Sequence, residues 1–236
     1  MSNLPLSAQL INLLAAVLLL LAFAMLAQRR VLTLINLFAA QGFALACSTG
    51  IVAYATHQPH LYGSSALTLL LKVFVLPWLL HRLINQLDVR WEFETLINVP
   101  TTMIIGIVLV VFAFNLAVPI SQLASTVTRS TLGIAMASVL VSFLMMIVRR
   151  KAIPQVIGFL AMENGLFFAA TSATYGMPLV VELGIALDVL VAMLILGVFF
   201  FQIREQFDSL DLKHLERLKE DVAEEDAQAT SQDVVE

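Results

Sequence analysis

Long apolar runs separated by short polar breaks dominate the sequence. A transmembrane helix needs about 20 predominantly apolar residues, and seven runs are long enough to meet this requirement. They are Leu4–Ala27, Val31–Thr56, Leu61–Leu80, Thr101–Val118, Thr131–Val148, Ala152–Thr174 and Leu179–Ile203. The pattern predicts an all-α integral membrane protein with about seven transmembrane helices, because an isolated helix satisfies its own backbone hydrogen bonds in lipid.

The overall composition agrees with this interpretation. The chain of 236 residues is 60% hydrophobic and 13% charged, with a mean hydropathy of +0.92. A soluble domain is closer to half apolar and a quarter charged. The run Leu4–Ala27 has no basic leader and exceeds the length of a signal-peptide core, so we expect it to be a retained anchor.

Two kinds of proline position are visible in the runs. Pro100, Pro154 and Pro178 lie at expected helix starts, where a missing N–H does no harm. Pro77 lies inside the third run instead. Its missing N–H predicts a kink or a local opening of that helix.

The basic residues at the breaks predict the orientation in the membrane. With seven helices, nearly all of them fall on one side, and Arg129 lies on the opposite side. The residues on the shared side are Arg29, Arg30, Arg82, Arg90, Arg149, Arg150, Lys151, Arg204 and, in the tail, Lys213, Arg217 and Lys219. Cytoplasmic loops are enriched in Lys and Arg. We therefore expect the N-terminus outside and the C-terminus in the cytoplasm.

These patterns divide the chain into a membrane domain and a short tail. Residues 1–204 form the expected seven-helix domain, and its segment 152–203 carries carboxylates within apolar surroundings. Residues 205–220 have apolar positions among charges, which predicts a cytoplasmic amphipathic helix. Residues 221–236 are acidic and polar without periodicity, which is typical of disorder. The acidity of the tail favours a protein partner over an anionic membrane surface.

No familiar cofactor or metal motif is present in the sequence. Cys47 is the single cysteine, which excludes an intramolecular disulfide framework and a cysteine-ligated iron–sulfur or zinc site. The sequence also has no P-loop, Rossmann glycine pattern or HExxH motif. His57 and His60 are three residues apart, but a third metal ligand is not evident. We expect no cofactor, no metal, no nucleic-acid partner and no redox centre in this chain.

Ionisable residues within the apolar runs are the candidate functional groups. With a rise of ~1.5 Å per residue, Glu163 lies ~18 Å from Lys151, near the middle of a ~30 Å hydrocarbon core. Lys72 and Asp188 fall at similar depth, and Glu182 is about one helical turn from the outer edge. Charged groups at this depth are costly and typically mark an ion or proton pathway. We therefore predict a network of Glu163, Asp188, Lys72 and Glu182.

A structural interpretation stays open beside the functional one. Lys72 and Glu163 can form a static buried ion pair that fixes the register of two helices, with no ion moving. Glu182, near an interface, can be structural as well. Four amide side chains within the runs are expected to form hydrogen bonds between helices rather than to bind a ligand: Asn12, Asn36, Gln41 and Asn164.

Two blocks of sequence resemble a known family. The block Gly158-Phe-Leu-Ala-Met-Glu-Asn-Gly165 is followed by Leu179-Val-Val-Glu-Leu-Gly-Ile-Ala-Leu-Asp188. Together they resemble component E of hydrogenase-4. The spacing from Lys72 to Pro77 and the tail segment Phe207–Lys219 are also similar to that family.

The resemblance implies a membrane subunit without redox centres, in a complex related to respiratory complex I and formate hydrogenlyase. The last three helices are similar to subunit K of complex I and to the C subunit of Mrp-type antiporters. In those proteins carboxylates on two successive helices link the proton paths of neighbouring subunits. By this resemblance Glu163 takes the first position, and Asp188 or Glu182 takes the second. Lys72 lies outside the three-helix unit, so its role rests on the physical argument alone.

The expected function is therefore a contribution to proton or sodium translocation in the inner membrane of a prokaryote. The implied partners are antiporter-like membrane subunits and soluble iron–sulfur subunits of a hydrogenase or dehydrogenase. Two alternatives remain: a subunit of an Mrp-type cation/proton antiporter without redox activity, and a structural membrane scaffold.

Overall fold

All the elements in the described part of the chain are helical. The computed structural model describes residues 5–57, 59–87, 96–121 and 126–174, together with Gly184 and Gly197. The elements are α1 (Leu6–Ala27), α2 (Val31–Thr56), α3 (Pro59–Thr68), a π-helical stretch η1 (Leu69–Val75), α4 (Leu76–Leu87), α5 (Val99–Ser121), α6 (Thr126–Val148) and α7 (Ala152–Thr174). Six helices in these ranges are long and apolar enough to cross a membrane, with α3, η1 and α4 together forming one of them. The expectation of an all-α multi-pass membrane protein is confirmed.

The helix bounds follow the apolar runs closely and differ mainly at the ends. The bounds of α2 and α7 are those that the sequence predicts. The prediction that the helix ends before Pro119 was wrong, because α5 continues through Pro119 to Ser121. Helix α6 likewise begins at Thr126, before the expected Thr131. Hydropathy marks the length embedded in lipid, and polar residues can extend a helix beyond that length.

The expected seventh helix and tail lie outside the described residues. Only Gly184 and Gly197 of the run Leu179–Ile203 are described. The tail segments 205–220 and 221–236 are not described at all.

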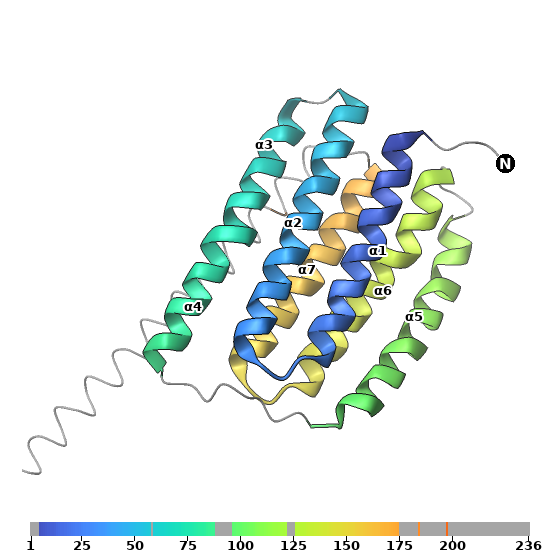
Figure 1. The fold of residues 1–236 in the computed structure, drawn as a ribbon. Helices are drawn as coiled ribbons and strands as arrows, with labels where there is room; N and C mark the ends of the chain where they lie inside the picture. Colours follow the sequence, from blue (N-terminus) through green and yellow to red (C-terminus); the bar gives the residue numbers. More distant parts are fainter. Residues whose placement is uncertain are drawn as a thin grey trace, which may run out of the picture. The chain divides into compact units, whose positions relative to one another are not determined.

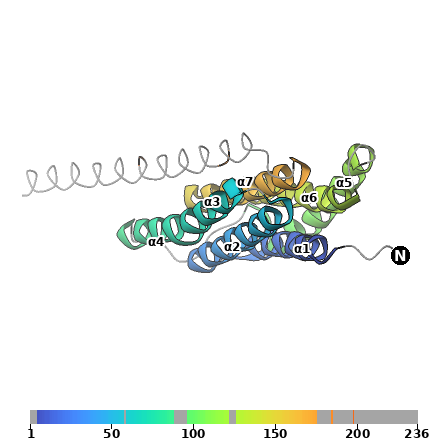
Figure 2. The same cartoon turned by 90° about the horizontal axis from the view of Figure 1, so that it is seen from above.

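The helices of residues 5–174 lie side by side in two layers. Seen from above, α1 and α2 lie against a row made by α3/α4, α7, α6 and α5 (Figures 1 and 2). Helix α1 packs on α2 and α6, and α2 packs on α3, η1 and α7. Helix α2 therefore contacts both η1 and α7, two segments that are far apart in the sequence.

Small residues allow several of the helices to approach one another closely. Ala8, Ala15 and Ala22, spaced by seven residues, are buried along one stripe of α1. Between α6 and α7, a Cβ on Gly158 would come within 2.9 Å of Met146, and one on Gly165 within 2.9 Å of Val139. Lipid is as apolar as leucine, so membrane helices associate by close packing rather than by the hydrophobic effect. Gly158 and Gly165 therefore allow α6 and α7 to approach each other closely.

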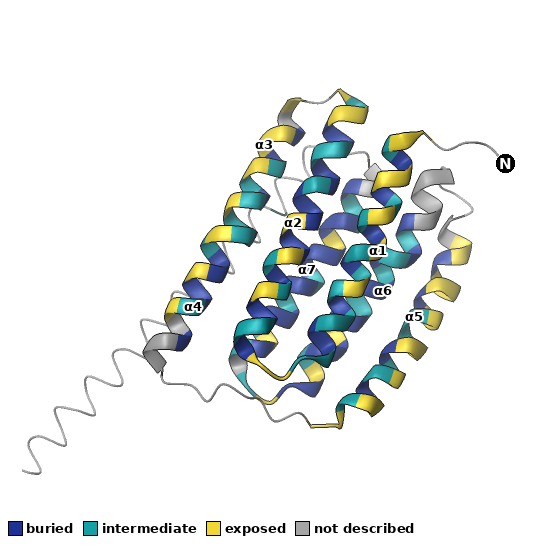
Figure 3. Ribbon diagram, in the orientation of Figure 1, coloured by how far each residue is buried: buried dark blue, intermediate teal, exposed yellow. Residues whose placement is uncertain are grey.

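Helix α5 is the least buried of the six candidate spans. Its outer face in Figure 3 is mostly exposed. Exposed large apolar side chains on α5 include Ile104, Ile107, Val108, Val111, Phe112, Phe114, Leu116 and Val118. Such a continuous apolar surface suits contact with lipid or with another transmembrane subunit.

Arg149, which directly follows α6, forms hydrogen bonds with the end of α1. Its guanidinium donates hydrogen bonds to the carbonyls of Met25 (3.2 Å), Leu26 (3.1 Å) and Gln28. The last carbonyls of a helix have no partner within the helix, and a buried arginine supplies donors for them. Burial, with a smaller contribution from the Arg29 charge, lowers the pKa of Arg149 to about 10. The side chain therefore remains charged at neutral pH.

This contact brings two basic connections to the same end of the helices. Arg29 and Arg30 lie between α1 and α2, and Arg150 and Lys151 lie between α6 and α7. The structure thus places side by side two of the basic breaks that the sequence predicts on one side of the membrane.

We expect Arg149→Leu to lower the free energy of unfolding by about 1–3 kcal/mol, because buried carbonyls at the end of α1 lose their donors. Thermal unfolding of the purified protein in detergent measures the change. Arg150→Leu is the matched control, since Arg150 is exposed. Equal Tm values for the two variants would contradict the anchoring role of Arg149.

Candidate functional site

Lys72 lies on a helical segment whose turns are locally widened. The stretch Leu69–Val75 is π-helical, and the N–H of Leu76 bonds to the carbonyl of Leu71, five residues earlier. Pro77 follows directly; it has no N–H, and its ring would clash with the carbonyl four residues before it in a regular α-helix. The local opening that Pro77 predicts is confirmed. Single turns of π-helix often occur at functional sites.

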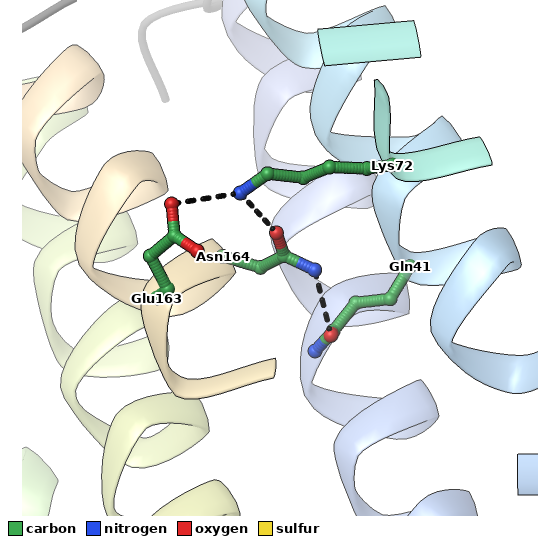
Figure 4. Close-up of polar contacts among 4 residues, drawn as sticks. All are labelled: Gln41, Lys72, Glu163 and Asn164. Carbon is green, nitrogen blue, oxygen red and sulfur yellow. Dashed lines mark hydrogen bonds and ion pairs between the residues drawn. The ribbon is translucent and has the colours of Figure 1, made fainter. Parts of the chain in front are cut away.

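The ammonium group of Lys72 forms an ion pair with Glu163 in the interior of the bundle. Lys72 Nζ lies 3.1 Å from Glu163 Oε1, and the two side chains are 1% and 3% exposed. Figure 4 shows the lysine extending from its helix toward α7. Both residues lie near the middle of their helical segments. The expectation that they share a depth is therefore met by direct contact between them.

Two amide side chains continue the polar contacts from this pair to α2. Lys72 Nζ donates to Asn164 Oδ1 at 2.8 Å. Asn164 Nδ2 in turn donates to Gln41 Oε1 at 3.1 Å (Figure 4). Asn164 and Gln41 are both fully buried. Their expected role as hydrogen-bond partners between helices is confirmed.

The surroundings of the polar contacts are apolar and tightly packed. The ring of Phe167, one turn after Glu163 on α7, has its centroid 5.9 Å from Lys72 Nζ. A Cβ on Gly42 would come within 2.9 Å of Lys72 Cβ, so the glycine lets α2 approach the backbone of η1. In such surroundings each charge depends on its immediate partners, because water does not screen it.

The other two predicted site residues, Asp188 and Glu182, lie outside the described residues. Gly184, between them in the sequence, is described, and a Cβ at this position would clash with the ring of Phe167. The glycine at 184 therefore lies directly against the residue that also contacts Lys72.

The arrangement can hold a cation and a carboxylate together in a space closed to lipid. A protonated Lys72 donates to one charged and one neutral oxygen, and Glu163 can exchange a proton if water or another side chain reaches it. Within the described ranges, no three His, Cys, Asp or Glu side chains gather as metal ligands.

Phe167 and Gly42 belong to this site but were not predicted from the sequence. Phe167 is one of fifteen phenylalanines in an apolar chain, so composition gives no signal for it. Gly42 directly follows Gln41, and both lie near the middle of the second run. Their position along the run could have indicated that they lie at the depth of Lys72 and Glu163. Neither position by itself reveals which residue it would face.

Together, these features define a multi-pass helical membrane protein with an ion pair buried among its helices. The chain is 33% identical over 194 residues to "Uncharacterized protein Rv0085" of Mycobacterium tuberculosis, covering 82% of this chain and 88% of that protein. The chain belongs to the same family as this mycobacterial protein.

A more distant homology extends to a named membrane component. The chain is 22% identical over 166 residues to hydrogenase-4 component E of Escherichia coli K12, covering 70% of this chain and 76% of that protein. The same values hold for hydrogenase-4 component E of Shigella flexneri. No family model matches the chain. No solved structure matches it either.

We expect Gly42→Ala to lower the stability of the protein, because the added methyl group would overlap with Lys72 Cβ. Overpacking typically costs about 1–3 kcal/mol, which exceeds the gain of about 1 kcal/mol from replacing a helical glycine. Thermal unfolding in detergent measures the effect.

The matched control is Gly63→Ala on α3, where nothing lies within 4 Å of an added Cβ. This change should leave Tm unchanged or raise it slightly. A rise in Tm for both variants would contradict the close approach of α2 to η1.

Proposed function

We propose that this protein is a non-redox membrane subunit of a complex related to hydrogenase-4, formate hydrogenlyase and respiratory complex I. In this role it contributes to the translocation of protons or sodium ions. The main support for this proposal is the ion pair of Lys72 and Glu163, which places two charges in a buried contact between described helices. The distant homology to hydrogenase-4 component E gives the kind of complex.

The cost of burying these charges is the physical support for function. Removing an ion from water into a protein interior costs several kcal/mol, and the attraction within an ion pair often fails to exceed this cost. Apolar residues at positions 72 and 163 would pack the same helices at no such cost. A chain that keeps both charges at the middle of its helices is therefore well suited to moving charge.

Glu163 is the proton-exchanging group in this proposal, and Lys72 responds to it. When Glu163 releases a proton, the ammonium of Lys72 stabilises the carboxylate at 3.1 Å. When Glu163 takes up a proton, the pair loses its attraction. The energies of the two states are thus brought closer together than they would be for a lone buried carboxylate.

Asp188 and Glu182 extend the path along the proposed seventh helix. They are six residues apart, so they point in directions roughly 120° apart on a helix. A proton passing between them requires water or a side chain from another helix. Gly184, which lies between them in the sequence, lies against Phe167, the residue whose ring also faces Lys72.

The proposed setting is the inner membrane of a prokaryote. We propose seven transmembrane helices in residues 1–204, with the N-terminus outside and the C-terminus in the cytoplasm. Antiporter-like subunits would lie against exposed apolar faces such as that of α5. Soluble iron–sulfur subunits would bind on the cytoplasmic side, where residues 205–220 and the acidic residues 221–236 are proposed to lie.

The direct contact within the ion pair also supports a second candidate function. A lysine and a glutamate at hydrogen-bonding distance can fix the register of α7 against η1 without moving an ion. In that case the chain is a structural subunit, either of the same complex or of a cation/proton antiporter without redox activity.

Replacing Glu163 by Gln separates the two functions, because Gln keeps the shape and removes the exchangeable proton. We expect ion uptake by the assembled complex in inside-out vesicles to fall by roughly tenfold or more, as typically follows the loss of a proton-transfer group. Glu163→Asp, which keeps a carboxylate, is the matched control and should retain part of the activity. Normal ion uptake by an assembled Glu163→Gln complex would refute translocation through Glu163 and leave the structural role.

A further inference from the structure

The ammonium of Lys72 has two acceptors of different chemistry on the same helix. Glu163 Oε1 at 3.1 Å carries charge when the carboxyl group is ionised, whereas Asn164 Oδ1 at 2.8 Å is always neutral. Successive residues on a helix point about 100° apart. The lysine head group therefore lies between two directions on α7 instead of facing the carboxylate alone (Figure 4).

The hydrogen bond to Gln41 fixes the orientation of the Asn164 amide. Asn164 Nδ2 donates to Gln41 Oε1 at 3.1 Å, which leaves Asn164 Oδ1 facing Lys72. Turning the Asn164 amide over would place its NH₂ group against the ammonium and its oxygen against the oxygen of Gln41. Both contacts would be repulsive, so one orientation is strongly preferred.

The two amides form a chain of hydrogen bonds that runs from Gln41 through Asn164 to Lys72. The carbonyl of Gln41 polarises the amide of Asn164, and hydrogen bonds aligned in this way strengthen one another in a medium of low dielectric constant. The ring of Phe167, with its centroid 5.9 Å from Lys72 Nζ, presents its negative face to the cation. None of these three groups changes charge at physiological pH.

We propose that Gln41, Asn164 and Phe167 form a neutral cage that holds Lys72 as an ammonium group while Glu163 is uncharged. This inference rests on the proposed function for the step in which Glu163 takes up a proton. That step removes the carboxylate charge that faces Lys72 Nζ at 3.1 Å, which is costly for a buried cation. With the cage, fixed dipoles replace part of the lost attraction. Asn164 and Gln41 are then positioning residues for Lys72.

A double-mutant cycle on the purified protein in detergent tests the cage. Glu163→Gln imitates the uncharged glutamate, and Asn164→Leu removes the neutral acceptor at similar size. Glu163→Gln leaves Lys72 two neutral oxygen acceptors and no carboxylate, whereas Asn164→Leu leaves it the carboxylate alone. The double variant should lose at least about 3 °C more in Tm than the sum of the single changes.

Two further variants make the test specific to the cation. Adding Lys72→Met to the double variant removes the charge that needs the cage, so Tm should return to the range of the single variants. Gln41→Met should also couple with Glu163→Gln, because it removes the acceptor that orients Asn164. Asn115→Leu is the matched control: Asn115 is exposed on α5 and bonds its own helix at Val111, so it should be additive with Glu163→Gln.

The outcomes separate this inference from the proposed function. Additive changes in Tm, or a double variant that Lys72→Met does not rescue, would overturn the cage, even if Glu163→Gln abolishes ion uptake. Coupling with rescue would support the cage. If coupling and rescue are found while the Glu163→Gln complex transports ions normally, the cage stands and the proposed function fails.

Discussion

A lysine and a glutamate that meet between apolar helices set the main constraint on this structure. Their side chains are 1% and 3% exposed, so the cost of burying them must be offset by contacts within a few ångströms. The ion pair, the oriented amide of Asn164 and the ring of Phe167 are those contacts. The packing of α2, η1 and α7 can be understood as the arrangement that brings these groups together at one depth.

The local structure around Lys72 follows from this constraint. Gly42 allows α2 to approach the lysine backbone, which places Gln41 within reach of Asn164. The widened turns of η1 precede Pro77, whose missing N–H interrupts regular α-helical bonding. A π-helical stretch and an α-helical one differ in the direction of their side chains, so the geometry of this segment decides whether Lys72 faces α7.

Much of the fold could be predicted from the sequence, because the bounds of membrane helices depend on local hydropathy. Val31–Thr56 and Ala152–Thr174 were predicted to the residue, and the expected depths of Lys72 and Glu163 agree with their contact. Depth says nothing about rotation, however. The alignment of Asn164 with Gln41 and the placement of Phe167 depend on how three distant segments pack, and no single run of residues contains that information. Asp188 and Glu182 remain predictions.

The most direct test of the account is to purify the protein from its native membrane in a mild detergent and identify its companions by mass spectrometry. An ion-translocating subunit of the proposed kind should copurify with antiporter-like membrane chains and with iron–sulfur subunits of a hydrogenase or dehydrogenase. Antiporter-like chains alone would move the assignment to a cation/proton antiporter. Recovery of the protein without any partner would contradict the account and favour a static ion pair.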